Sequence, residues 1–107
     1  MKINDVDVSG FDAVLKNDSL VFVDFWAQWC GPCRMVGPVL EQLAEEYTDR
    51  CRFIKVNVDD EPALAARFGI QSIPSLLLFQ NGKLVDSAVG AMPRSFYSQL
   101  IEKALKG

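Results

Sequence analysis

The two cysteines of the segment Trp29-Cys30-Gly31-Pro32-Cys33 carry the clearest chemical signal in the chain. A C-x-x-C pair where an apolar β-prone run gives way to a helical pattern is typical of a thiol-disulfide redox site. Residues three apart in the first turn of a helix are neighbours, so the two sulfurs can form a small disulfide ring. Cys30 would lie at the helix N-terminus, where free N–H groups favour a thiolate, and Cys33 would be shielded one turn inside. This asymmetry predicts that Cys30 attacks a disulfide and Cys33 resolves the mixed disulfide.

A zinc site is the main alternative interpretation of the pair. Zinc in a structural site needs four protein ligands, and the chain has no His and one further cysteine, Cys51. The absence of His also excludes a Ser-His-Asp triad and a Cys-His protease pair. The redox interpretation is therefore favoured and no metal is expected. Cys51 is interpreted as a small buried apolar residue, with a regulatory or intermolecular thiol as the alternative.

Length and composition indicate one ordinary globular domain over residues 1–107, with 50% hydrophobic and 23% charged residues. The net charge of −3 argues against nucleic acid or an anionic membrane as partner. No apolar signal segment follows Met1, and no stretch approaches the roughly 20 apolar residues that a membrane span needs. We expect a cytoplasmic protein whose thiols are normally kept reduced.

Hydrophobic periodicity predicts the elements that must position the pair. The run 20–26 is almost continuously apolar, which is typical of a strand buried on both faces. The helix that follows Cys33 contains Pro38, which should bend it. A capping box of Ser9 and Asp12 is expected to open a helix that ends near Lys16. The other predicted elements are a strand over 52–58, a helix over 62–68 closed by Gly69, strands over 76–80 and 83–89 joined by a type I′ turn at Asn81-Gly82, and a final amphipathic helix around 96–105.

The order of these elements predicts an α/β fold. With a first strand ahead of the first helix, the chain follows the order (β)αβαβαββα. Strands joined through a helix normally run parallel with right-handed crossovers, so we expect a parallel core to which the Asn-Gly hairpin adds an antiparallel edge. The prediction is a central mixed sheet of about five strands, flanked by about four helices on both faces.

The segment Trp26-Ala27-Gln28-Trp29-Cys30-Gly31-Pro32-Cys33 resembles the active-site signature of the thioredoxin family. The resemblance continues over essentially the whole chain. Asp24 matches the family's buried carboxylate, Lys55 the lysine beside it, and Pro38 the proline that bends the helix. Ile73-Pro74 matches the cis-proline loop, and Gly82 and Gly90, followed by Ala91, match the glycine loops. Arg34 and Ser75 stand where the family more often has Lys and Thr. The resemblance implies the thioredoxin fold and reduction of protein disulfides, with the chain cycling between a dithiol and a Cys30–Cys33 disulfide.

The resemblance also implies roles for residues around the pair. Asp24, set among apolar neighbours, would be a buried acid with a raised pKa that accepts the proton of Cys33, through water. Lys55 would partner Asp24 and lower that pKa, or would only lay its stem along apolar surface. The residues expected to bind an extended target segment are Trp29, Ile73, Pro74, Gly90 and Ala91.

The implied partners are disulfide-containing target proteins and a separate thioredoxin reductase, and the chain would act as a monomer. No G-x-G-x-x-G or P-loop pattern occurs, so no nucleotide cofactor is expected. Gly31 and Pro32 are expected to tune the redox potential, because oxidases and isomerases of the same fold typically carry a His between the cysteines. An oxidase or isomerase, and a binding subunit without turnover, are the alternative functions.

Overall fold

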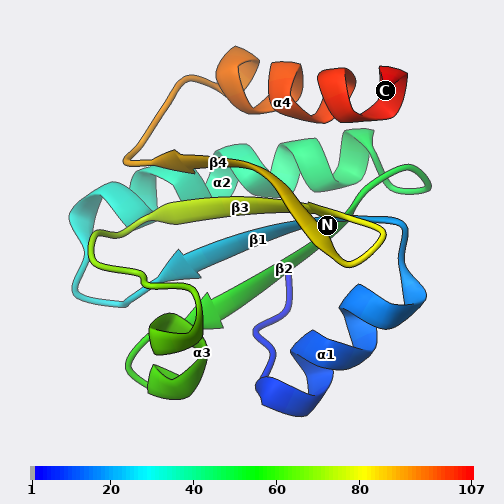
Figure 1. Ribbon diagram of the computed structural model, residues 1–107. Helices are drawn as coiled ribbons and strands as arrows, with labels where there is room; N and C mark the ends of the chain where they lie inside the picture. Colours follow the sequence, from blue (N-terminus) through cyan, green and yellow to red (C-terminus); the bar gives the residue numbers. More distant parts are fainter. Residues whose placement is uncertain (1) are drawn as a thin grey trace.

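The computed structural model describes residues 2–107 (Figure 1). Eight elements follow one another along the chain: α1 (Val8–Asn17), β1 (Leu20–Trp26), α2 (Gly31–Glu46), β2 (Arg52–Asn57), α3 (Pro62–Arg67), β3 (Ser75–Gln80), β4 (Lys83–Val89) and α4 (Arg94–Lys106). Each predicted helix is present, as are the four strands predicted after the first helix, with ends that differ by one or two residues. Within residues 2–107, none of the helices combines the length and the apolar character that crossing a membrane requires.

The sheet has the strand order β2-β1-β3-β4, so β1 and β3 are its inner strands. β1 pairs parallel with β2 and antiparallel with β3, and β4 pairs antiparallel with β3. Helices α2 and α4 cover one face of the sheet, and α1 and α3 cover the other (Figure 1). The predicted α/β arrangement, a mixed sheet with helices on both faces, is confirmed.

The prediction of about five strands is wrong by one. The sheet within residues 2–107 has four strands, and the segment ahead of α1 contributes a single isolated bridge between Asp5 and Lys55. Two backbone hydrogen bonds support this bridge, from Val6 N–H to the Lys55 carbonyl and from Lys55 N–H to the Asn4 carbonyl. Asp7 then caps α1, so the chain leaves the sheet edge before a strand can develop.

The expected parallel core is limited to the pair β1/β2, because β3 runs antiparallel to β1. The connection from β2, residues 58–74, forms the short helix α3 and a loop and does not cross back along the sheet. β3 therefore begins at the same end at which β1 and β2 finish.

Local capping also differs from the prediction at α1. The N-cap is Asp7, whose Oδ1 accepts a hydrogen bond from Gly10 N–H at 2.8 Å, and Ser9 lies inside the first turn. The capping box of Ser9 and Asp12 is therefore wrong, because the carboxylate two residues earlier already caps the helix. The hairpin turn agrees with the prediction, since Asn81 and Gly82 have φ of +52° and +81° and a type I′ turn needs positive φ at both.

Tyr97 on α4 anchors the loop that follows β4. Its side chain is fully buried against the α2 face of the sheet. Its hydroxyl accepts a hydrogen bond from Met92 N–H at 2.9 Å and donates one to the Gly90 carbonyl at 3.1 Å. One side chain thus fixes the backbone on both sides of Ala91.

Replacing Tyr97 by Phe should lower the free energy of unfolding by about 1–3 kcal/mol, because two backbone groups of the loop lose their partner. Urea unfolding monitored by circular dichroism measures this loss. Tyr47→Phe is the matched control, because the Tyr47 hydroxyl donates to the Glu102 carboxylate at 2.6 Å, and that partly exposed carboxylate can turn to water. Equal losses in the two variants would contradict the anchoring role of Tyr97.

Candidate active site

Cys30 and Cys33 form a disulfide at the start of α2, with their Cα atoms 5.3 Å apart. Cys30 is the N-cap of the helix, and the N–H of Cys33 donates a hydrogen bond to the Cys30 Sγ at 3.2 Å. Pro32 occupies the first turn, where its missing N–H has no intrahelical partner to lose. The first sulfur therefore receives the backbone N–H and the positive end of the helix dipole, which both stabilise a thiolate.

The exposed fraction of the whole residue does not separate Cys30 from Cys33 as the sequence suggested. Cys30 is 5% exposed and Cys33 is 4% exposed, so both are buried. The difference between them lies in their backbone positions. Cys30 ends the turn after β1, with its N–H bonded to the Ala27 carbonyl at 3.2 Å, whereas Cys33 lies within the helix.

The loop ahead of β3 packs against this pair. The carbonyl oxygen of Ile73 lies 3.7 Å from the Cys30 Sγ, and the Ile73–Pro74 bond is cis, as the family resemblance implied. Gly90 N–H donates to the Pro74 carbonyl at 2.8 Å, and Gly90 has a φ of +90°, a conformation that favours glycine. Three of the five predicted target-binding residues are therefore in one place. Ala91 follows Gly90 and is exposed.

Trp29, the remaining predicted target-binding residue, is 67% exposed. Its indole Nε1 donates a hydrogen bond to Asp59 Oδ2 at 2.8 Å. It lines a shallow hollow of about 160 Å³ together with Val58, Ile70 and Ile73. The sequence did not single out Asp59, because nothing local marks a carboxylate thirty residues away as the partner of this ring.

Asp24 is buried in the middle of β1, with 3% of its surface exposed. Its Oδ1 has no hydrogen-bond partner among residues 2–107. Burial raises the pKa of Asp24 from 3.8 to about 7. The positive charge of Lys55 lowers this pKa, and the negative charge of Asp5 raises it. The carboxyl therefore titrates in the range in which a proton can be both taken up and released at neutral pH.

Lys55 lies opposite Asp24 in the parallel pair β1/β2, yet no ion pair joins them within the described part of the chain. Its Nζ lies 4.0 Å from Asp5 Oδ2 and 4.5 Å from the centre of the Trp26 ring. Trp26 Nε1 in turn donates to Asp5 Oδ1 at 2.7 Å. Asp5 is a neighbour that sequence reasoning missed, since its contacts depend on the position of the segment before α1.

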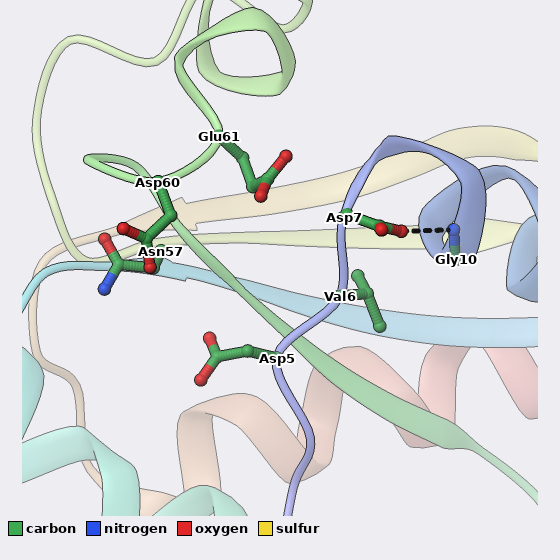
Figure 2. A pocket seen from close by; sticks show the side chains of 7 residues that line it. All are labelled: Asp5, Val6, Asp7, Gly10, Asn57, Asp60 and Glu61. Atoms are coloured by element: carbon green, nitrogen blue, oxygen red, sulfur yellow. Dashed lines mark hydrogen bonds between the residues drawn. The ribbon is translucent and has the colours of Figure 1, made fainter.

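An acidic pocket of about 410 Å³ is lined by Asp5, Asp7, Asp60 and Glu61, among other residues (Figure 2). These carboxylates do not form a metal centre, because no group of three or more His, Cys, Asp or Glu side chains within residues 2–107 is arranged to hold an ion.

A family model described as thioredoxin matches residues 2–103. The chain belongs to the thioredoxin family. It is 48% identical to the thioredoxin of Porphyra purpurea over 97 residues, 91% of each chain, and 50% identical to thioredoxin 1 of Nostoc sp. over 92 residues, 86% of each chain. The structure is similar to that of a mutant thioredoxin from Halobacterium salinarum, with a TM-score of 0.88, 35% identity, and coverage of 95% of this chain and 88% of that one. A Plasmodium falciparum thioredoxin structure gives a TM-score of 0.86 and 38% identity, with 94% and 97% covered.

These relatives and the disulfide at the start of α2 show a thiol-disulfide oxidoreductase with the thioredoxin fold and protein-disulfide reductase activity. As in this family generally, its partners are proteins that contain disulfides and a reductase that supplies electrons.

Replacing Asp24 by Asn should increase the free energy of unfolding of the oxidised protein more at pH 8 than at pH 4. The folded-state pKa of about 7 lies above the unfolded value near 3.8, so the stabilisation from the bound proton is complete below pH 3.8 and is lost as the pH rises through 7. The loss is about 4 kcal/mol, and the Asn variant avoids it. Urea midpoints of both proteins at pH 4 and pH 8 measure the effect. The same difference at both pH values would mean that Asp24 is not a strained buried acid.

Cys51 is the free cysteine, and it is 4% exposed in the core on the α2 side of the sheet. Its burial agrees with the interpretation as a small apolar residue. Burial raises the pKa of the Cys51 thiol to about 12, although the Phe22 backbone opposes this shift.

The oxidised protein should therefore resist iodoacetamide at pH 8. At a pKa of about 12 only about 10⁻⁴ of the Cys51 thiol is ionised at that pH, against about a quarter of an ordinary thiol with a pKa of ~8.5. Mass spectrometry should find one alkylated cysteine after unfolding in guanidinium and none before. Rapid alkylation of the folded protein would contradict a buried, inert thiol.

Proposed function

We propose that this chain reduces protein disulfides through a mixed disulfide on Cys30, which Cys33 resolves. The observation that carries the proposal is the hydrogen bond from Cys33 N–H to the Cys30 Sγ at the N-terminus of a 16-residue helix. In the reduced protein this N–H and the helix dipole stabilise the Cys30 thiolate. The thiolate attacks one sulfur of the target disulfide, the new S–S bond forms as the old one breaks, and the second target sulfur leaves as a thiolate that takes up a proton.

Asp24 is proposed as the proton acceptor in the resolving step. It lies on the same face of β1 as Phe22, the face that α2 covers, and α2 begins at the cysteine pair. Asp24 takes the Cys33 proton, through water, and the Cys33 thiolate attacks the Cys30 sulfur. The bond to the target breaks, and the target sulfur leaves as a thiolate that takes up a proton from the solvent. The chain has then lost two electrons and the target has gained two electrons and two protons.

The resolving cysteine supplies most of the rate advantage. Stabilising the Cys30 thiolate increases the amount of nucleophile but weakens each thiolate, with a Brønsted coefficient of about 0.4–0.5. Cys33 acts instead through proximity, because the Cα atoms are 5.3 Å apart and no second molecule has to collide. Effective molarities in well-oriented reactions of this kind reach about 10⁵–10⁸ M.

The target segment is proposed to dock across Trp29, Ile73, Pro74, Gly90 and Ala91. The backbone of Ile73 supports this docking mode. Within residues 2–107 its N–H has no backbone partner, and its carbonyl lies 3.7 Å from the Cys30 sulfur. An extended segment can pair with these groups as a short added strand, which would place its disulfide next to Cys30. The exposed Trp29 ring adds an apolar contact at the rim.

The reductive direction follows from the residues between the cysteines. Gly31 and Pro32 bring no positive charge to the thiolate, so they do not favour the dithiol as a His would. The chain would work as a monomeric electron carrier in the cytoplasm, re-reduced by a thioredoxin reductase and contributing to redox balance. The net charge of −3 supports protein rather than nucleic acid or anionic membrane partners.

The Cys33→Ser variant should accumulate mixed disulfides with target proteins, because the bond on Cys30 then has no internal resolver. The reduced variant is incubated with a protein disulfide substrate, and the covalent adduct is measured by non-reducing electrophoresis and mass spectrometry. The adduct should map to Cys30 and disappear on addition of a dithiol.

The matched control is Cys30→Ser, which keeps one active-site thiol at the other position. Cys30→Ser should trap little, and reduction of insulin with a dithiol donor should be lost in both variants. Better trapping by Cys30→Ser would reverse the two roles. Normal insulin reduction by either variant would contradict the dithiol mechanism.

A further inference from the structure

Asp5 joins two side chains near the buried Asp24. One of its carboxylate oxygens accepts the Trp26 Nε1–H at 2.7 Å, and the other lies 4.0 Å from the Lys55 ammonium. The ammonium also lies over the Trp26 ring, 4.5 Å from its centre. The three side chains thus form a closed set of contacts in which the lysine is held from two sides.

Alternation along the strands places this set on the same face of the sheet as Asp24. Phe22 and Phe53 belong to the core on the α2 side, and residues two apart on a strand share a face. Asp24 and Trp26 on β1 and Lys55 on β2 therefore point to that side. Lys55 is also the register partner of Asp24. Without other contacts, its ammonium would be expected to turn to this carboxyl.

We propose that Asp5 is a positioning residue for the active site: its carboxylate holds the Lys55 ammonium against Trp26 and so leaves the buried Asp24 carboxyl without an ion pair. Asp24 then keeps its proton up to neutral pH. This agrees with its surroundings, because Asp24 is buried and its Oδ1 has no hydrogen-bond partner within residues 2–107. The negative charge of Asp5 acts in the same direction.

Titratable groups from three segments of the described chain interact with Asp24. β2 contributes Lys55, and the segment before α1 contributes Asp5. From α4 comes Tyr97, whose own pKa is raised by burial and by the charge of Asp24, so that it stays neutral near pH 7. α2 covers the same face of the sheet and begins at the cysteine pair, which is uncharged in the disulfide. The pair of Lys55 and Asp5 is therefore what sets the local charge balance.

Asp5 can be replaced without disturbing the core. It is exposed, and it lines the acidic pocket in which its side chain points away from that of Asp7 (Figure 2). Asp5→Asn keeps an oxygen that can accept the Trp26 hydrogen bond and removes only the charge that holds the lysine. Asp60→Asn is the matched control, because it removes the same charge from the same pocket at a residue whose side chain makes no hydrogen bond or ion pair with Lys55 or Trp26 within residues 2–107.

The experiment measures the titration of the Asp24 carboxyl carbon by NMR in the oxidised protein. Asp5→Asn should lower the Asp24 pKa by about 1, because the released Lys55 ammonium can move close to the Asp24 carboxyl. This shift corresponds to a tenfold rise in the ratio of carboxylate to acid at pH 7. Asp60→Asn should change the Asp24 pKa by no more than about 0.3. An unchanged pKa in Asp5→Asn, or equal shifts in the two variants, would overturn the proposal.

A second background separates release of the lysine from direct repulsion. In Lys55→Met, Asp5→Asn should lower the Asp24 pKa by less than half as much as in the natural sequence, because there is no ammonium left to release. The same shift in both backgrounds would mean that Asp5 acts by its charge alone, and would overturn the positioning role.

The effect of Asp5 on the Asp24 pKa does not depend on the proposed function. Only its effect on the catalytic rate rests on the proposed role of Asp24 as proton acceptor. The rate at which the mixed disulfide is resolved should follow the lowered pKa in Asp5→Asn, so that its rise with pH begins about one pH unit earlier. If the NMR titration shifts and this rate profile does not, the proton-acceptor role of Asp24 fails, whereas the control of Asp24 by Asp5 is upheld.

Discussion

The inner position of β1 is the constraint on which the rest of the structure depends. β1 pairs with β2 on one side and β3 on the other, and cores cover both of its faces. The chain therefore leaves its carboxyl end at a fixed place, makes one turn closed by the bond between Cys30 N–H and the Ala27 carbonyl, and enters α2. Cys30 is held at the helix N-terminus by the packing of a buried strand and a long helix, not by a free loop.

The direction of β3 is the second requirement of the site. β3 starts at the end of the sheet where β1 stops, because the connection through α3 does not cross back along the sheet. This brings the Ile73 carbonyl to 3.7 Å from a sulfur 43 residues earlier in the chain. A parallel β3 would begin at the opposite end of the sheet, and the loop proposed to bind targets would lie far from the disulfide.

The same inner strand carries an electrostatic penalty. Asp24 lies among apolar side chains with an unpartnered oxygen, and its ionisation at neutral pH destabilises the fold. The surrounding core tolerates this conflict, and such local conflicts concentrate at functional sites. The contacts of Lys55 with Asp5 and Trp26 belong to the same arrangement, since a lysine paired directly with Asp24 would lower the pKa of Asp24 and reduce the penalty.

The sequence by itself determined the features that arise within a few residues. These are the spacing of Cys30 and Cys33 at a strand-to-helix junction, the buried character of Asp24, and the Asn81-Gly82 turn. Helix periodicity, turn chemistry and apolar runs are local, so they can be recognised along the chain. Only the tertiary structure decided the four-stranded sheet, the antiparallel β3, the similar burial of the two cysteine residues, and the partners of the two tryptophans. Each depends on segments 20 or more residues apart that meet because of how helices and strands pack. A carboxylate such as Asp5 or Asp59 looks the same in the sequence whether it meets water or an indole N–H. The packing of the whole chain makes that choice.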